Sequence, residues 1–277
     1  KFACGMKPNL VEHPGEIQES VCEIVGAARG GVHDAWVGGQ TVGVEPPEAR
    51  AISVLHHRSA GLVPSMKFRH EKHDIFIPDQ TDPDVALNRV THLGIVSHQD
   101  DLEIAAYHGI TECFHSGDKW FGGVVVTNGS GSPRKGPYAD YTDEEMQHVR
   151  LIEQRKAAYV GEYSYMVQLS YPSEDVKEHR RADVVADLKF ILEQSQPQVV
   201  YLHNPCDRHD THVATFLRCL DALRSMPREM RPSKVYGCEV WRKLDWLLSE
   251  DKVMLWVDKH PHMLRPLLGV FDSQISG

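Results

Sequence analysis

The stretch that decides the fold runs over residues 93–103 and reads Leu93-Gly94-Ile95-Val96-Ser97-His98-Gln99-Asp100-Asp101-Leu102-Glu103. Its first four residues are an apolar run of the kind that forms a buried strand. Polar residues follow at once, and residues 102–114 have a helix-like pattern. Because a buried strand leading directly into a helix is the first half of a βαβ unit, this stretch predicts a parallel sheet covered by helices.

The same alternation of apolar runs and helical patterns continues along the rest of the chain. Further strands are predicted at residues 124–126, 165–169, 199–202, 234–241 and 253–257. Helices are predicted at 142–160, 173–194 and 209–225, with a last one after His262. In the first of these, Thr142 serves as N-cap and Glu145 as its capping-box partner. We therefore expect an α/β fold with a mostly parallel sheet and right-handed crossovers.

Residues 1–88 have a different texture, with proline and glycine scattered through them. Residues 16–28 have the spacing of apolar residues that one face of a helix requires. Residues 48–62 could form a second helix. We expect residues 1–88 to form an irregular or helical N-terminal extension that packs on a main domain of residues 89–277.

Composition limits the classes of function. The chain has 277 residues, 41% of them hydrophobic, 25% charged, and a formal net charge of −9. This net charge argues against a nucleic-acid partner, and no apolar run approaches the length of a membrane span. The six cysteines have neither zinc-finger nor disulfide-scaffold spacing, which favours buried thiols in a reducing, cytoplasmic compartment. The sequence leaves open whether the protein forms a homo-oligomer.

Two polar clusters each follow a predicted strand directly. The first spans residues 97–103, and the second reads His203-Asn204-Pro205-Cys206-Asp207-Arg208-His209-Asp210-Thr211-His212. Ligands of open parallel sheets bind at the carboxyl ends of the strands, so both clusters are predicted to border one site.

The residue types in these clusters suit a catalytic metal ion. A catalytic zinc takes about three protein ligands from His, Asp and Glu and keeps one position open. His98 and Asp101 can reach one point from the strand end and the first helical turn. His209 and His212 share a helix face, so one can bind metal while the other handles protons or an oxyanion. Asp100 is then a carboxylate free to act as general base.

Simpler readings of these residues stay open at this point. Asp100 and Asp101 could be acids favoured at a helix N-terminus. The spacing of His209 and His212 also occurs at His70 and His73, where no strand precedes it and a solvated charged stretch is expected.

Residues 97–103 resemble the AHPDDxE signature of the PIG-L/LmbE-like zinc-dependent N-deacetylases, and Asp207-x-His209-x-x-His212 resembles that family's second motif. Weaker marks are Arg150-x-x-Glu153 and Asp272-Ser273-Gln274, so the resemblance covers about residues 90–275. It implies a Rossmann-like α/β domain over residues 89–277, Zn²⁺ as cofactor, and hydrolysis of an N-acyl group on a small amino sugar or sugar conjugate.

The resemblance also implies roles for individual residues. His98, Asp101 and His212 would be the zinc ligands, and Asp100 the general base. His209 would stabilise the tetrahedral intermediate or protonate the leaving amine. Candidate substrate contacts are Asp207, Asp210, Ser130 and Arg134.

The chain departs from the family pattern in three places, and other functions stay open. One is the loop after the second strand, which has Gly129-Ser130 where family members often carry Gly-Glu. Gln99 replaces a proline, which we expect to loosen the turn, and a supporting aspartate moves from the position of Thr211 to Asp210, so that Asp207 could take over its task. Trp120, Tyr171 and Trp241 could stack on a sugar ring, although single aromatic residues more often belong to the core. Alternative functions are a zinc amidase or hydratase of the same superfamily acting on a non-sugar molecule, and a non-catalytic sugar-binding module.

Overall fold

The centre of the fold is a six-stranded sheet in a computed structural model that describes residues 4–6 and 66–275. The strand order is β2-β5-β4-β3-β6-β7. Only β2 runs antiparallel to its neighbour; the other neighbouring strands are parallel. This confirms the mostly parallel sheet expected from the sequence. The strands are β2 (Asp74–Phe76), β3 (His92–Val96), β4 (Phe121–Thr127), β5 (Tyr165–Tyr171), β6 (Val199–His203) and β7 (Lys234–Cys238).

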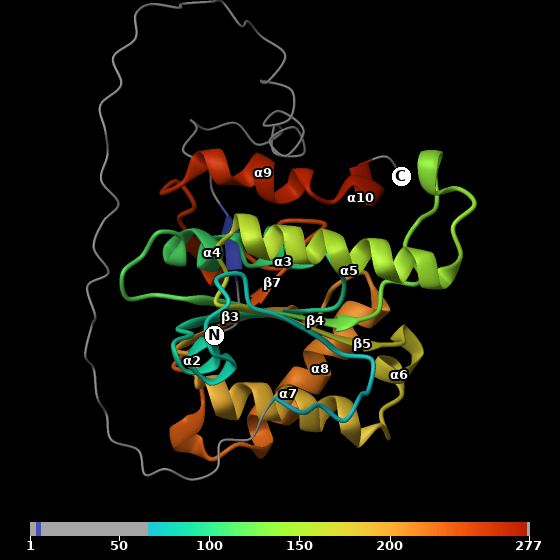
Figure 1. Cartoon of the computed structure of the whole chain (residues 1–277). Helices are drawn as coiled ribbons and strands as arrows, with labels where there is room; N and C mark the ends of the chain where they lie inside the picture. Colours follow the sequence, from blue (N-terminus) through green and yellow to red (C-terminus); the bar gives the residue numbers. More distant parts are fainter. Residues whose placement is uncertain (1–3, 7–65, 276–277) are drawn as a thin grey trace, which may run out of the picture. The chain divides into compact units, whose positions relative to one another are not determined.

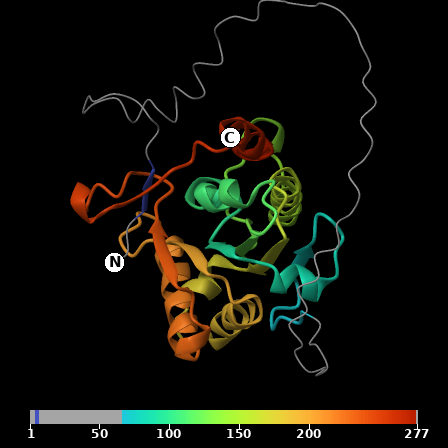
Figure 2. The ribbon, with the colours of Figure 1, turned by 90° about the vertical axis from the view of Figure 1, so that its left-hand side faces the viewer.

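Helices cover both faces of this sheet (Figure 1). One layer holds α2 (Pro83–Asn88), α6 (Ser173–Lys177), α7 (Ala182–Ser195) and α8 (Asp210–Ser225). The other holds α3 (Asp101–Ala105), α4 (Tyr107–Cys113), α5 (Asp143–Val160), α9 (Leu264–Gly269) and α10 (Asp272–Ile275). Figure 2 shows the same two layers from the side. A second sheet has two strands, in which β1 (Cys4–Met6) pairs in parallel with β8 (Val253–Leu255).

Burial on both faces explains the continuous apolar run of β3. Leu93 and Ile95 belong to the hydrophobic core beneath α7 and α8, whereas Val96 belongs to the core beneath α3 and α4. Gly94 lets α3 approach the sheet closely, because a Cβ atom there would lie 2.5 Å from a methyl carbon of Leu102. The strand therefore holds the start of α3 directly against its own carboxyl end.

The start of α5 confirms the predicted capping box. The Thr142 hydroxyl accepts a hydrogen bond from the Glu145 backbone N–H at 3.2 Å, and the Glu145 carboxylate accepts one from the Thr142 N–H at 2.8 Å. The helix then ends at Gly161, as predicted.

Two predicted helices are each divided in the structure. The helix expected at 102–114 breaks at Ala106, whose backbone leaves the helical region, and this break separates α3 from α4. The helix expected at 173–194 is interrupted after α6, where Glu178 is extended and its carboxylate accepts from the Arg180 N–H. Local side-chain hydrogen bonds of this kind compete with the helical ladder. The last two strands are shorter than predicted.

The N-terminal part of the chain is described only from residue 66 and at residues 4–6. The helices predicted at 16–28 and 48–62 lie outside the described residues. Within the described part, β2 joins the large sheet through β5 and α2 packs into the same core, and neither was predicted. The boundary at residue 88 and the packing of an extension stay predictions. Across residues 4–6 and 66–275, we find no helix that combines the length and the apolar character needed to traverse a bilayer.

Candidate metal centre

Two loops carry the polar clusters to one place. β3 and β6 are neighbours in the sheet, so the loops that leave their carboxyl ends lie side by side. Asp100 adopts a left-handed backbone conformation, with φ of 87°, directly before α3. This turn sends the chain from the strand into the helix and leaves Asp100 and Asp101 with separate environments.

Three side-chain atoms from these loops form a compact triangle. His98 Nδ1 lies 3.2 Å from Asp101 Oδ2 and 3.1 Å from His212 Nε2. His212 Nε2 lies 3.3 Å from the same Asp101 oxygen. A tetrahedral ion with bonds of about 2.0 Å holds its ligand atoms about 3.3 Å apart. The spacing and the chemistry of these donors therefore fit a metal ion such as zinc.

The electrostatics of the triangle favour a positive charge. Burial raises the pKa of Asp101, but the charge of His212 and the close imidazoles of His203, His212 and His98 outweigh it and hold the pKa well below its usual range. Burial lowers the pKa of His212, yet the two neighbouring aspartates raise it to about 9. The site thus holds an ionised carboxylate that attracts a cation.

Asp207 supports His212 from the other side of its ring. One carboxylate oxygen lies 3.2 Å from His212 Nδ1, and the side chain has no exposed surface. The same oxygen accepts the backbone N–H of His209 at 2.9 Å. A carboxylate on the second imidazole nitrogen fixes the orientation of a metal-binding histidine. Predicted from sequence as a substrate contact, Asp207 lies where it can orient His212.

His209 stands next to the triangle as the N-cap of α8. Its Nδ1 accepts the backbone N–H of Thr211 at 3.2 Å, so the ring proton lies on Nε2. The ring is 4.9 Å from that of His98 and 4.7 Å from that of His212. Burial and the neighbouring imidazoles of His98 and His212 lower the pKa of His209, which favours the neutral form of the ring.

Two other sets of donors overlap the triangle and could also hold a metal ion: His98 with His209 and His212, and the buried group of Asp101, His203 and His212. His203 Nε2 accepts the backbone N–H of Ser97 at 2.9 Å, and its ring stacks on that of His212 at 3.9 Å. Since this hydrogen bond uses the lone pair, we assign His203 to the buried wall of the site rather than to a ligand position. Burial and the charge of His212 lower the pKa of His203 to about 4.

Asp100 lies outside the triangle and contacts a buried arginine. Arg150 Nη2 is 3.2 Å from an Asp100 oxygen and also donates to the carbonyl of Gln99. Its Nη1 donates to Glu153 at 2.9 Å and to the Ser273 hydroxyl at 3.3 Å. Burial raises the pKa of Asp100, and the charge of Arg150 opposes that rise. Sequence reasoning noted Arg150, Glu153 and Ser273 only as weak family marks and missed this contact.

Gln99 anchors the turn instead of loosening it. Its side chain is buried and donates to the carbonyl of Thr127 at 3.3 Å and to Gln168 Oε1 at 3.2 Å. Both acceptors lie on neighbouring strands of the sheet, β4 and β5. The expectation of a looser turn was wrong because the amide ties the loop to two strands where a proline could not.

The remaining residues predicted to contact the substrate have other partners in the structure. Asp210 is exposed and pairs with Lys177 at 3.2 Å. Arg134 pairs with Asp143 and donates to the carbonyl of Ser130 at 3.0 Å. Most of the polar groups that were predicted to bind substrate are therefore engaged in contacts within the protein.

Four aromatic or histidine residues that the sequence analysis named make contacts within the folded domain. Trp120 lies beneath the guanidinium of Arg89, and the hydroxyl of buried Tyr171 donates to Asp187 at 2.7 Å. His70 packs its ring on Tyr171, and His73 packs edge-on against a core phenylalanine. The segment with His70 and His73 is therefore partly packed rather than a fully solvated stretch.

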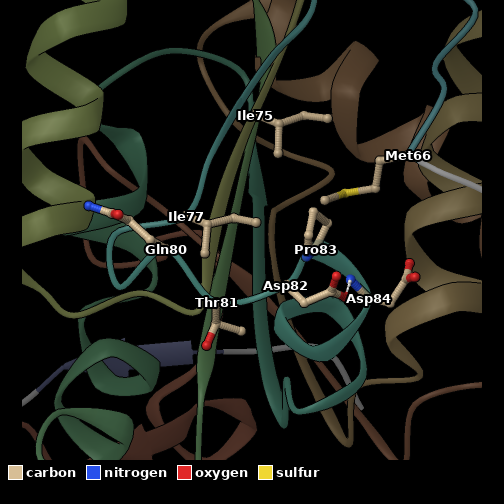
Figure 3. Close-up of a pocket in the computed structure, with 8 residues that line it drawn as sticks. All are labelled: Met66, Ile75, Ile77, Gln80, Thr81, Asp82, Pro83 and Asp84. Carbon is tan, nitrogen blue, oxygen red and sulfur yellow. Dashed lines mark hydrogen bonds between the residues drawn. The ribbon is translucent and has the colours of Figure 1, made fainter.

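A separate pocket lies at the β2 edge of the large sheet (Figure 3). It is lined by residues of β2, α2 and the connecting loop, among them Ile75, Ile77 and Pro83. None of the clustered histidines contributes to it, so this pocket is distinct from the candidate metal centre.

The fold and the cluster define a class: an α/β protein with a His/Asp site, suited to a divalent metal ion, at the carboxyl ends of two parallel strands. The family model of the GlcNAc-PI de-N-acetylases, PIG-L, matches residues 93–223. This match spans 131 of the 277 residues and agrees with the resemblance of the two polar clusters to that family; it supports a hydrolase of the deacetylase type.

Solved structures with low sequence identity share the fold. The conserved protein TT1542 from Thermus thermophilus aligns with a TM-score of 0.53 and 16% identity, over 68% of this chain and 81% of its own. The N,N′-diacetylchitobiose deacetylase from Pyrococcus horikoshii aligns with a TM-score of 0.50 and 19% identity, over 66% and 70%. A comparison with curated protein sequences found no match.

Proposed function

We propose that this protein is a zinc-dependent hydrolase that removes an N-acyl group, in the first instance N-acetyl, from an amino sugar or sugar conjugate. The observation that carries the proposal is the triangle of His98 Nδ1, Asp101 Oδ2 and His212 Nε2, with separations of 3.1–3.3 Å. A second carboxylate, that of Asp100, stands beside the triangle. The match to the PIG-L family model supports the reaction class.

His98, Asp101 and His212 would hold the metal ion. A divalent ion in such a site polarises the acyl carbonyl and lowers the pKa of a bound water. Asp207, against His212 Nδ1, keeps that ring oriented with Nε2 toward the other two donor atoms.

Asp100 is positioned to act as the general base. Its backbone N–H donates to Gln154 at 3.2 Å, and Arg150 holds one of its carboxylate oxygens. In this arrangement Asp100 accepts the proton of the attacking water while Arg150 keeps the carboxylate in place. General-base catalysis of this kind contributes about 10²- to 10⁴-fold in rate.

His209 supplies a hydrogen-bond donor for the charge that develops on the substrate. Because Nδ1 is engaged by the Thr211 N–H, the free proton on Nε2 can stabilise the oxyanion or pass to the departing nitrogen. Ser130 and Asp210 remain candidates for contacts with sugar hydroxyls at the edge of the site.

The test combines metal analysis with product release. The purified full chain is analysed for zinc and assayed for acetate release from N-acetylglucosamine and N,N′-diacetylchitobiose, beside a panel of unsaturated acids. We expect about one zinc per chain and acetate release that His212→Ala abolishes together with the zinc. His179→Ala, a substitution of an exposed histidine, is the matched control and should change neither.

Three outcomes would contradict the proposal. Hydration of an unsaturated acid without acetate release would favour a hydratase, and release from non-sugar amides alone would favour an amidase. Sugar binding with no stoichiometric metal and no turnover would indicate a binding module.

A further inference from the structure

The segment that follows β7 is fastened to the loop that carries His209 and His212. The side chain of Glu239 is almost fully buried and accepts hydrogen bonds from Arg242 Nε at 2.8 Å and from the Leu244 N–H at 2.9 Å. Arg242 also donates to the carbonyl of Cys206 at 3.1 Å. On the same side, the Asn204 amide donates to the carbonyl of Cys238 at 3.0 Å. Residues 239–244 therefore form a fixed turn beside the metal centre.

This turn has a feature that costs stability. Leu244 has a φ of 53°, in the left-handed region that favours glycine, while its side chain is 1% exposed. A buried leucine in that conformation persists only where the surrounding contacts fix it. The geometry of residues 239–244 is thus set by Glu239, Arg242 and Leu244, and the contacts that fix it do not involve the side chain of Trp241.

That residue is Trp241, and its indole is left uncovered. The side chain is 58% exposed although it stands next to a buried metal-centre histidine. The indole is nearly parallel to the ring of His212, with an interplanar angle of 12° and centroids 6.1 Å apart. A large aromatic ring held in one orientation at the border of a polar site has the geometry of a surface against which a ligand packs.

We propose that Trp241 is a specificity-determining residue, whose indole takes the carbon face of the sugar ring that bears the N-acyl group. The inference rests on the proposed function, since it assumes that the site binds an N-acylated sugar. One face of a pyranose presents C–H groups, whose positive edges complement the negative face of the indole, while the hydroxyls point outward to polar groups and water.

Trp256 provides a matched control. It is 55% exposed, close to the value for Trp241, and follows β8 in the separate two-stranded sheet. Trp241→Ala, Trp241→Phe and Trp256→Ala are compared by acetate release from N-acetylglucosamine and by titration of the intrinsic fluorescence with the same sugar. Zinc content and thermal stability are measured for each variant.

Trp241→Ala should raise KM and weaken sugar binding about 3- to 10-fold, with a smaller effect on kcat. Trp241→Phe, which keeps an aromatic face, should retain most of the affinity, and Trp256→Ala should match the wild type. Zinc content and stability should stay constant, because the indole is exposed and binds no metal.

Two results would overturn the inference, and they are distinguishable. If the wild type releases acetate from the sugar and Trp241→Ala leaves KM and binding unchanged, the role of Trp241 is refuted while the proposed function stands. If the zinc-loaded wild type neither binds nor deacetylates N-acetylated sugars, the proposed function fails and the inference fails with it.

Discussion

Glu153→Gln tests the buried network behind Asp100. The Glu153 carboxylate lies 2.9 Å from Arg150 Nη1 and accepts the backbone N–H of Ser273 at 2.7 Å and its hydroxyl at 2.8 Å. Both Glu153 and Arg150 are almost completely buried. Glutamine keeps the size and an acceptor oxygen but removes the charge that pairs with Arg150.

The expected loss follows from the contacts that remain. Removing one partner of a buried ion pair costs about 3–5 kcal/mol, because the other charge is left without compensation. Arg150 keeps Asp100 and the Gln99 carbonyl, so we expect a value near the lower end, about 3 kcal/mol. For a domain of this size, that corresponds to a fall in Tm of about 6–12 °C.

Urea unfolding followed by circular dichroism measures this loss, with the zinc content held constant between samples. Glu144→Gln, an exposed change of the same type in α5, is the control and should stay within about 0.5 kcal/mol of the wild type. A loss below about 1 kcal/mol for Glu153→Gln would refute the reasoning, since Arg150 would then tolerate burial without its partner.

Three further predictions concern the proposed general base Asp100, the close packing of α3 on the sheet at Gly94, and the loss of stability at low pH. Asp100→Asn should lower kcat by about 10²- to 10⁴-fold while zinc remains bound, and full activity in a zinc-replete sample would remove Asp100 from the mechanism. Gly94→Ala should cost about 1–3 kcal/mol in urea unfolding, because its Cβ would lie 2.5 Å from a methyl carbon of α3, whereas Gly131→Ala, with nothing within 4 Å, should be neutral. Burial raises the pKa of Glu112, but two lysines outweigh it and lower the pKa to about 2. Its stabilisation is therefore complete above the ordinary value of 4.5 and is lost as pH falls toward 2, so Glu112→Gln should flatten the acid limb of a stability–pH curve measured by thermal unfolding.

The sequence predicts the central strands well because their signal is local. β3 and β6 lie between helices, so each is a continuous apolar run followed at once by polar residues. The capping box of α5 is likewise a four-residue pattern. The break at Ala106 was not predictable, because it lies in an uninterrupted helix-like stretch and depends on how α3 and α4 pack.

In the candidate site, too, the local features were predictable from the sequence and the tertiary ones were not. The residue types of the two loops predict metal chemistry, but their convergence depends on the pairing of β3 with β6, which the chain order does not specify. The contact of Arg150 with Asp100 joins positions far apart in the chain, and no local pattern reveals it. Asp207 was predicted either to contact the substrate or to take over the task of the displaced aspartate, because its burial behind His212 is a tertiary property that the local pattern does not reveal.

The bond between Arg150 and Ser273 spans 123 positions of the chain. During synthesis, the loops after β3 and β6 emerge long before α10, so Arg150 acquires its full set of partners only when residue 273 has left the ribosome. A chain that stops before residue 273 would keep every donor atom of the triangle and would lose the contacts that Ser273 makes with Arg150 and Glu153. We therefore expect a truncation before Ser273 to reduce turnover more than it reduces metal binding.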